Sequence, residues 1–157
     1  LLITKSDIEN ETRKLNLENT FEKLFEYGAV PVINENDSVA TEEIVYGDND
    51  SLSAIVARLV KADALIILSD IDGLFDKNPS EPDAKLIERV EKVTDDIKAL
   101  AGGAGTSRGT GGMITKLKAA EIVNPAGIDM IITNGSKTEN IYDAIAGKSV
   151  GTRFTVK

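Results

Sequence analysis

Residues 48–70 read DNDSLSAIVARLVKADALIILSD, and this stretch decides the fold class. Apolar residues first recur at helical spacing up to Lys61, which predicts a helix with Asn49 or Asp50 near its N-terminus. A continuous apolar run over 64–68 follows, too short for a helix of its own, and predicts a buried strand. A helix that leads at once into a buried strand is typical of α/β domains.

The segment upstream repeats this alternation. A helical pattern behind Asn16, a possible cap, runs to a stop at Gly28. The β-branched run over 30–33 then predicts a second buried strand, which ends in polar residues.

The segment downstream adds more elements of both kinds. Pro, Gly and charged residues over 71–84 predict a surface loop, and Thr94 is expected to cap a short helix. After a Gly-rich loop over 101–112, the pattern predicts a helix over 113–126 and a core strand over 128–133. A last helix is expected over 141–146. We therefore predict an α/β three-layer sandwich with a mostly parallel central sheet, formed by residues 1–157 as one domain.

Composition limits the function. The 157 residues carry a net charge of −8, so nucleic acid and membrane surfaces are not expected partners. Neither cysteine nor histidine occurs, so the chemistry must run without thiol or imidazole. No apolar run approaches the roughly 20 residues of a membrane-spanning helix, and we expect a cytoplasmic protein. Because the chain opens with a strand-like segment and no initiator Met, we expect its N-terminal part to be missing.

The loop over 109–116, GTGGMITK, precedes or begins a helix. Glycines allow close backbone approach, the free N–H groups of a helix start attract anions, and Lys116 can meet phosphate charge. The sequence matches neither the Walker A nor the dinucleotide-binding template. A flexible linker before a helix is the alternative interpretation.

Polar clusters follow or precede the predicted core elements. Asn34-Glu35-Asn36-Asp37 ends one strand, Gly47-Asp48-Asn49-Asp50 starts a helix, and Ser69-Asp70 ends another strand. In open α/β sheets ligands bind beyond the carboxyl ends of the strands, which favours a shared cleft. Ordinary turn and capping chemistry is the favoured explanation of either of the first two clusters when it is taken alone, and for Ser69-Asp70 it explains the residues as well as nucleotide contact does.

In combination and in order, these motifs resemble those of bacterial glutamate 5-kinases, from residue 1 almost to residue 157. VPVINEND at 30–37 and GDND at 47–50 resemble the substrate side of that family. Ser69-Asp70 and the loop over 109–116 resemble its nucleotide side, with serine where threonine is common. The resemblance implies the amino acid kinase fold, also described as carbamate kinase-like.

The resemblance also implies an activity, the ATP-dependent phosphorylation of the γ-carboxylate of L-glutamate, the first step of proline biosynthesis. Mg²⁺ would accompany ATP without a dedicated protein metal site. Lys116 would contact the transferring phosphoryl group, and Asp50 would orient Lys116. The residues implied to bind glutamate are Asp37, Asn49, Asn34 and Asn36. Those implied to bind nucleotide are Ser69, Asp70, Thr110, Gly111, Gly112, Met113, Ile114, Thr115 and Lys116.

One departure from the family bears on activity. The family begins with a Gly-Ser-rich turn that supplies a second phosphate-binding lysine, and no such segment occurs in residues 1–157. We therefore expect the chain alone to be catalytically inactive, and the full-length protein to be a homo-oligomer. The alternatives are a related kinase that acts on another acceptor and a module that binds nucleotide or amino acid without catalysis.

Overall fold

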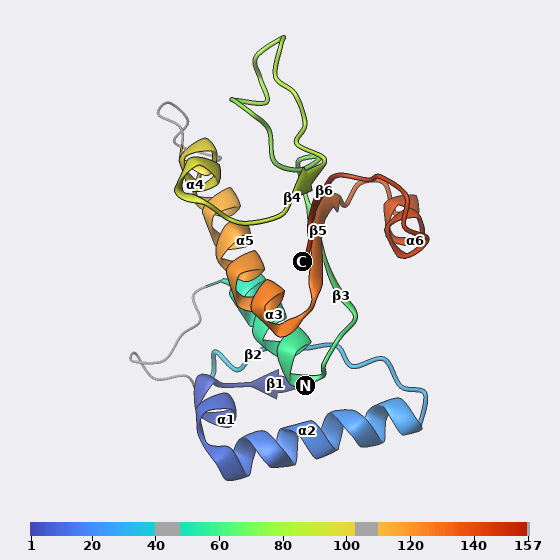
Figure 1. The fold of residues 1–157 in the computed structure, drawn as a ribbon. Helices are drawn as coiled ribbons and strands as arrows, with labels where there is room; N and C mark the ends of the chain where they lie inside the picture. Colours follow the sequence, from blue (N-terminus) through green and yellow to red (C-terminus); the bar gives the residue numbers. More distant parts are fainter. Residues whose placement is uncertain (40–47, 103–109, 157) are drawn as a thin grey trace.

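A four-stranded sheet forms the centre of the computed structural model, which describes residues 1–39, 48–102 and 110–156 (Figure 1). In spatial order its strands are β3 (Ala64–Ser69), β5 (Asp129–Asn134), β6 (Thr152–Phe154) and β4 (Arg89–Val90). β3 and β5 run parallel, as do β4 and β6, whereas β5 and β6 are antiparallel. The prediction of a mostly parallel sheet is thus confirmed, with one antiparallel junction that the sequence did not indicate.

Helices cover both faces of this sheet (Figure 1). α3 (Asn49–Leu59) and α5 (Thr110–Val123) pack against each other on one face, and α6 (Glu139–Ile145) lies on the other. A 3-10 turn, η1 (Asn124–Ala126), follows α5 and ends at Gly127, whose φ of 83° suits glycine. The three-layer arrangement agrees with the sequence prediction.

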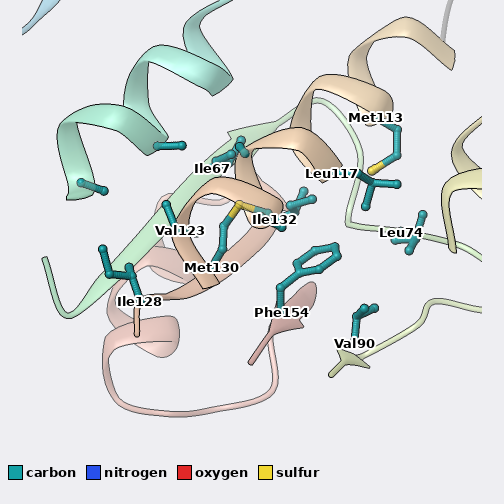
Figure 2. Packing of buried hydrophobic residues seen from close by; sticks show 14 of the residues in the cluster. Ile67, Leu74, Val90, Met113, Leu117, Val123, Ile128, Met130, Ile132 and Phe154 are labelled. Carbon is teal, nitrogen blue, oxygen red and sulfur yellow. The ribbon is translucent and has the colours of Figure 1, made fainter. Parts of the chain in front are cut away.

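The hydrophobic core lies between the sheet and the pair α3 and α5. Figure 2 shows side chains of the strands and of α5 meeting there, with the Phe154 ring among them. Small residues on both helices, Ala54 and Ala119 among them, are fully buried and permit close helix packing. The strands and α5 contribute to this core, among others, Ile67, Met130, Ile132, Phe154, Leu117 and Val123.

A second, smaller unit precedes this core. β1 (Leu2–Ile3) and β2 (Asn34–Glu35) form a separate two-stranded parallel sheet, with α1 (Lys5–Glu9) and α2 (Glu11–Glu26) between them in the chain. Figure 1 shows α2 lying beside this sheet, away from α5.

The bounds of α2 differ from the prediction at one end. The helix stops before Gly28, whose φ of 68° marks the expected glycine termination. It begins at Glu11 rather than after Asn16, because Asn10 caps it by accepting the N–H of Arg13 at 3.0 Å. Because the first turn of α2 is polar, the apolar pattern did not indicate this start.

The prediction of a buried strand over 30–33 is wrong. These residues lie outside any strand, and Val30 and Val32 are 87% and 81% exposed. Backbone hydrogen bonds at Val32 and Asn34 connect the segment to Leu1 on one side. Because the paired strand is only two residues long, the ladder does not extend back over the apolar run.

The region between β3 and α5 is mostly as expected. Residues 71–84 form an excursion beyond the sheet, closed by an antiparallel bridge between Phe75 and Leu86 (Figure 1). α4 (Asp95–Ala101) has the predicted cap at Thr94. α5 begins at Thr110, three residues before the predicted start at Met113, so the end of the expected Gly-rich loop is helical.

This topology determines where a site can form. α3 leads into β3 and α5 leads into β5, and each helix runs antiparallel to the strand that follows it (Figure 1). Since β3 and β5 are parallel, the N-termini of both helices lie toward the edge at which both strands end. That edge collects helix N–H groups and strand-end polar residues.

Candidate functional site

Three side chains meet where α3 contacts α5. The Thr115 hydroxyl donates a hydrogen bond to Oδ2 of Asp50 at 2.6 Å, and the Lys116 ammonium donates to the same oxygen at 3.1 Å. The Lys116 and Asp50 side chains are only 13% and 18% exposed, so salt screens their ion pair less than it would a surface pair. The structure therefore joins the two residues implied to be catalytic, while their catalytic roles remain predictions.

The start of α3 explains where the Asp50 carboxylate lies. Asp48 is the cap, and its Oδ1 accepts the N–H of Ser51 at 2.6 Å, while Asn49 and Asp50 follow at the N-terminus of the helix, as predicted. Asp50 is thus in the first turn, where the helix dipole stabilises negative charge. Its side chain is available to α5 because Asp48 performs the capping.

α5 brings Lys116 to the same point from the opposite side. The helix begins at Thr110, so Lys116 lies nearly two turns inside it rather than about one. Side chains on a helix lean toward its N-terminus, and the Lys116 ammonium also donates to the carbonyl of Gly112 at 3.3 Å. The charge of Lys116 therefore lies close to the first turn of α5, although its backbone does not.

The first three residues of α5 are among those implied to bind nucleotide. They are Thr110, Gly111 and Gly112, and their N–H groups have no carbonyl partner within the helix. A Cβ placed on Gly112 would meet nothing within 4 Å, so the backbone there is open to approach. Gly109 and the side-chain surroundings of Thr110 and Gly111 lie outside the described part of the structure.

The next three residues of the motif have different surroundings. Met113 is buried in the core, so only its backbone can face a ligand, whereas Ile114 is exposed. Thr115 directs its hydroxyl to Asp50 and not away from the protein. The resemblance implied a nucleotide-binding role for all three and did not distinguish their surroundings.

The residues implied to bind glutamate lie on two elements that touch. Asn34 is exposed on β2, Asn36 is half-buried just after it, and Asp37 is exposed. Asn49 is exposed at the start of α3, and β2 contacts α3. The two polar clusters are thus on neighbouring elements, while residues 40–47, Gly47 among them, fall outside the described ranges.

The carboxyl ends of β3 and β5 form a further polar group. Ser69 pairs in register with Asn134, and the Ser69 hydroxyl contacts Oδ1 of Asp70 at 3.1 Å. Asn134 donates from its side chain to Oδ1 of Asp72 at 3.0 Å. Ser69 and Asp70 therefore lie at the predicted edge of the sheet.

Sequence reasoning missed the residues that support this strand end. Thr152 is fully buried, and its hydroxyl accepts the N–H of Leu74 at 2.8 Å. Gly151 has a φ of 65° and lies against the carbonyl of Ile132. The polar end of β5 at Asn134 was a usable signal, whereas no local pattern placed β6 beside the loop after β3.

Two absences apply to the described part of the chain. Within residues 1–39, 48–102 and 110–156, no group of three or more acidic side chains is arranged to hold a metal ion. No helix in those ranges is both long and apolar enough to cross a membrane.

Comparison with curated proteins finds glutamate 5-kinases. One, from Clostridium tetani (strain Massachusetts / E88), is 54% identical over 155 residues, which are 98% of this chain and 58% of the relative. Another, from Caldanaerobacter subterraneus subsp. tengcongensis, is 55% identical over 156 residues, 98% of this chain and 42% of the relative. The chain thus spans about half the length of these relatives.

Comparison with solved structures supports the fold. The uridylate kinase of Archaeoglobus fulgidus matches 88% of this chain and 58% of its own, with a TM-score of 0.62 and 25% identity. A carbamate kinase from Giardia lamblia, solved with AMP-PNP, matches 89% of this chain and 44% of its own, with a TM-score of 0.63 and 23% identity. The model of the Amino acid kinase family matches residues 1–134, and the chain belongs to that family.

Proposed function

We propose that this chain takes part in the ATP-dependent phosphorylation of the γ-carboxylate of L-glutamate to γ-glutamyl phosphate, the first step of proline biosynthesis. The observation that carries the proposal is the shielded Asp50 and Lys116 pair, which links the first turn of α3 to α5. The names and the identity, above 50%, of the two glutamate 5-kinase relatives support the choice of glutamate.

The chemistry suits a chain without histidine. The γ-carboxylate of glutamate is already ionised near neutral pH, so its attack on the γ-phosphorus of ATP requires no general base. Catalysis then consists of positioning and charge stabilisation. Lys116 supplies a positive charge for the transferring phosphoryl group, and Asp50 holds that ammonium in place through Oδ2.

Several of the described residues support the binding of a nucleoside triphosphate. The first turn of α5 offers N–H groups that have no carbonyl partner within the helix, Gly112 leaves its backbone open, and Lys116 adds charge close by. Ser69 and Asp70 lie at the strand-end edge toward which these helix starts face, and we assign them to the nucleotide. Mg²⁺ would be held by the phosphates and water, which satisfy its preference for oxygen ligands.

Glutamate is assigned to the side of the site formed by β2 and the start of α3. Asp37 and Asn49 are exposed there and offer a carboxylate and an amide to the amino acid, with Asn34 and Asn36 nearby in the chain. A carboxylate such as Asp37 suits the ammonium group of an amino acid substrate.

The test uses a chimaera in which residues 1–157 replace the matching segment of the Clostridium tetani relative. Hydroxylamine traps γ-glutamyl phosphate as a hydroxamate, so its formation measures turnover. We expect Lys116→Met to lower turnover about a hundred- to a thousand-fold, as loss of a transition-state contact typically does. Lys118→Met, which changes an exposed lysine of the same helix, is the matched control and should have little effect.

The assay also separates the alternatives. Faster turnover with another carboxylate or with a phosphate acceptor than with glutamate would indicate a different kinase of this family. Binding of nucleotide without turnover on any acceptor would indicate a binding module. Near wild-type turnover of Lys116→Met would refute the role given to the Asp50 and Lys116 pair.

A second arm of the assay concerns residues 1–157 by themselves. Lys116 forms an ion pair with Asp50. In-line phosphoryl transfer requires negative charge to be neutralised on both the attacking side and the leaving side of the phosphorus. We propose that the isolated chain does not turn over, and hydroxamate formation equal to that of the chimaera would contradict this. Cytoplasmic location and homo-oligomerisation of the full-length protein are further proposals.

A further inference from the structure

We infer that Thr115 is a positioning residue that holds the Asp50 carboxylate for Lys116, and is not a ligand of the nucleotide. The inference rests on the proposed function. The resemblance implied that Thr115 binds nucleotide, whereas the structure directs its hydroxyl across the contact between α3 and α5 to Oδ2 of Asp50 at 2.6 Å.

The Thr115 hydroxyl has two acceptors within reach but only one proton. Besides Asp50 it lies 2.8 Å from the carbonyl of Gly112, the local bond that helical threonines commonly form. The carboxylate is the shorter and the charged acceptor, and hydrogen bonds to ionised groups are roughly twice as strong as neutral ones. The proton therefore goes to Asp50, and none is left for a phosphate oxygen.

The contact determines the orientation of the carboxylate. The terminal torsion of aspartate is broad, so a carboxylate with one partner can rotate. Oδ2 of Asp50 accepts hydrogen bonds from Thr115 and Lys116, which are successive residues of α5. The two donors together define where that oxygen lies. Without the hydroxyl, Lys116 would be paired with a carboxylate free to turn, and its ammonium would be less well placed for phosphoryl transfer.

The kinetic test compares Thr115→Val with Thr115→Ser in the chimaera. Valine keeps the shape without the hydroxyl, and we expect kcat to fall about tenfold while the KM for ATP changes less than about twofold. Serine keeps the hydroxyl and should restore kcat to within about threefold of wild type. The control is Thr20→Val in α2, which removes only a local bond to the carbonyl of Asn16 and should leave both parameters unchanged.

Two kinetic outcomes would overturn the inference. A raised KM for ATP with unchanged kcat in Thr115→Val would make Thr115 a nucleotide ligand. A kcat as low in Thr115→Ser as in Thr115→Val would assign the effect to the methyl group and not to the hydroxyl.

A stability cycle on the isolated chain separates this inference from the proposed function. Thr115→Val, Asp50→Ala and the double variant are compared with wild type by urea unfolding, because alanine leaves no acceptor for the Thr115 hydroxyl. If the hydroxyl contacts the carboxylate, the two changes should be coupled by about three- to tenfold in the unfolding equilibrium constant. Independent effects would refute the contact, whereas coupling in the chain together with an inactive wild-type chimaera would refute only the proposed function.

Discussion

Two apolar segments of similar composition have different structures in this protein. Residues 64–68 lie within β3, pair with β5 over the whole strand and contribute Ile67 to the core. Residues 30–33 lie outside any strand, with Val30 and Val32 exposed. The difference is in their partners, since β3 has a six-residue neighbour while the strand beside β2 has two residues. An apolar run therefore specifies a strand only where another segment is long enough to complete the ladder.

The largest effect should come from Gly151, at the junction between β6 and the end of β5. Its φ is 65°, and a Cβ there would overlap the carbonyl of Ile132. We expect Gly151→Ala to lower the free energy of unfolding by more than about 3 kcal/mol, because the left-handed backbone alone costs about 1 to 2 kcal/mol. Urea unfolding measures this change.

Gly147→Ala is the matched control for Gly151→Ala. Gly147 has a similar φ of 77°, but a Cβ there would meet nothing within 4 Å. The substitution should cost only the backbone penalty of about 1 to 2 kcal/mol. Equal losses in the free energy of unfolding at the two positions would show that the close packing of Gly151 against β5 contributes nothing to stability.

A pair of truncations compares the two regions directly. Ile132 is fully buried in β5, and Ile132→Ala should lower the free energy of unfolding by about 2 to 5 kcal/mol. Val32 is 81% exposed, and Val32→Ala should change the free energy of unfolding by less than about 0.5 kcal/mol. A cost at Val32 comparable to that at Ile132 would mean that the 30–33 run is covered in solution, and the contrast between the regions would fail.

Hydrogen exchange extends the comparison to the backbone. Amides of β5 lie in a ladder between two neighbours and next to the core, whereas those of β2 belong to a two-residue pairing. We expect amides of β5 to exchange at least about a hundredfold more slowly than those of β2, because local opening needs less free energy where few buried contacts hold a segment. Similar protection in β2 and β5 would contradict this.

The smallest effect concerns pH and the N-terminal unit. The hydrogen bond from the Thr4 hydroxyl, with further help from the Thr4 N–H and Arg13, holds the pKa of Asp7 below its ordinary value of 3.8. A lowered pKa in the folded state means that Asp7 stabilises the fold above about pH 4, and that this contribution is lost as pH falls through the folded-state pKa. The stability difference between wild type and Asp7→Asn should therefore shrink on acidification, as followed by unfolding from about pH 6 to about pH 2. A difference that is independent of pH would refute the role of the Asp7 charge.

Periodicity in the sequence was sufficient for the elements that are long and locally capped. It located β3 and β5 to within a residue or two, and it located the helix that becomes α3. Two of the two-residue strands, β2 and β4, escaped it, since they exist only through their partners and carry no periodic signal of their own.

The candidate site was predicted only in part, because several of its contacts join residues that are far apart in the sequence. Asp50 and Lys116 were paired through the resemblance, and the contact between α3 and α5 brings them together. The part played by Thr115 was not predicted, because its partner Asp50 lies 65 residues away in the sequence, on another helix. Thr152 and Gly151 were missed because the residues they contact, Leu74 and Ile132, are far from them in the sequence.

The most direct test of the account is a double-mutant cycle on turnover of the chimaera, with Asp50→Asn, Lys116→Met and the double variant. Hydroxamate formation from glutamate is measured for each, with Lys118→Met as the control. If Asp50 acts by holding Lys116, each single change should lower kcat about a hundred- to a thousand-fold, and the double variant should be within about tenfold of the worse single variant. Losses that multiply in the double variant would show that the two residues act independently, and would contradict a site built on their ion pair.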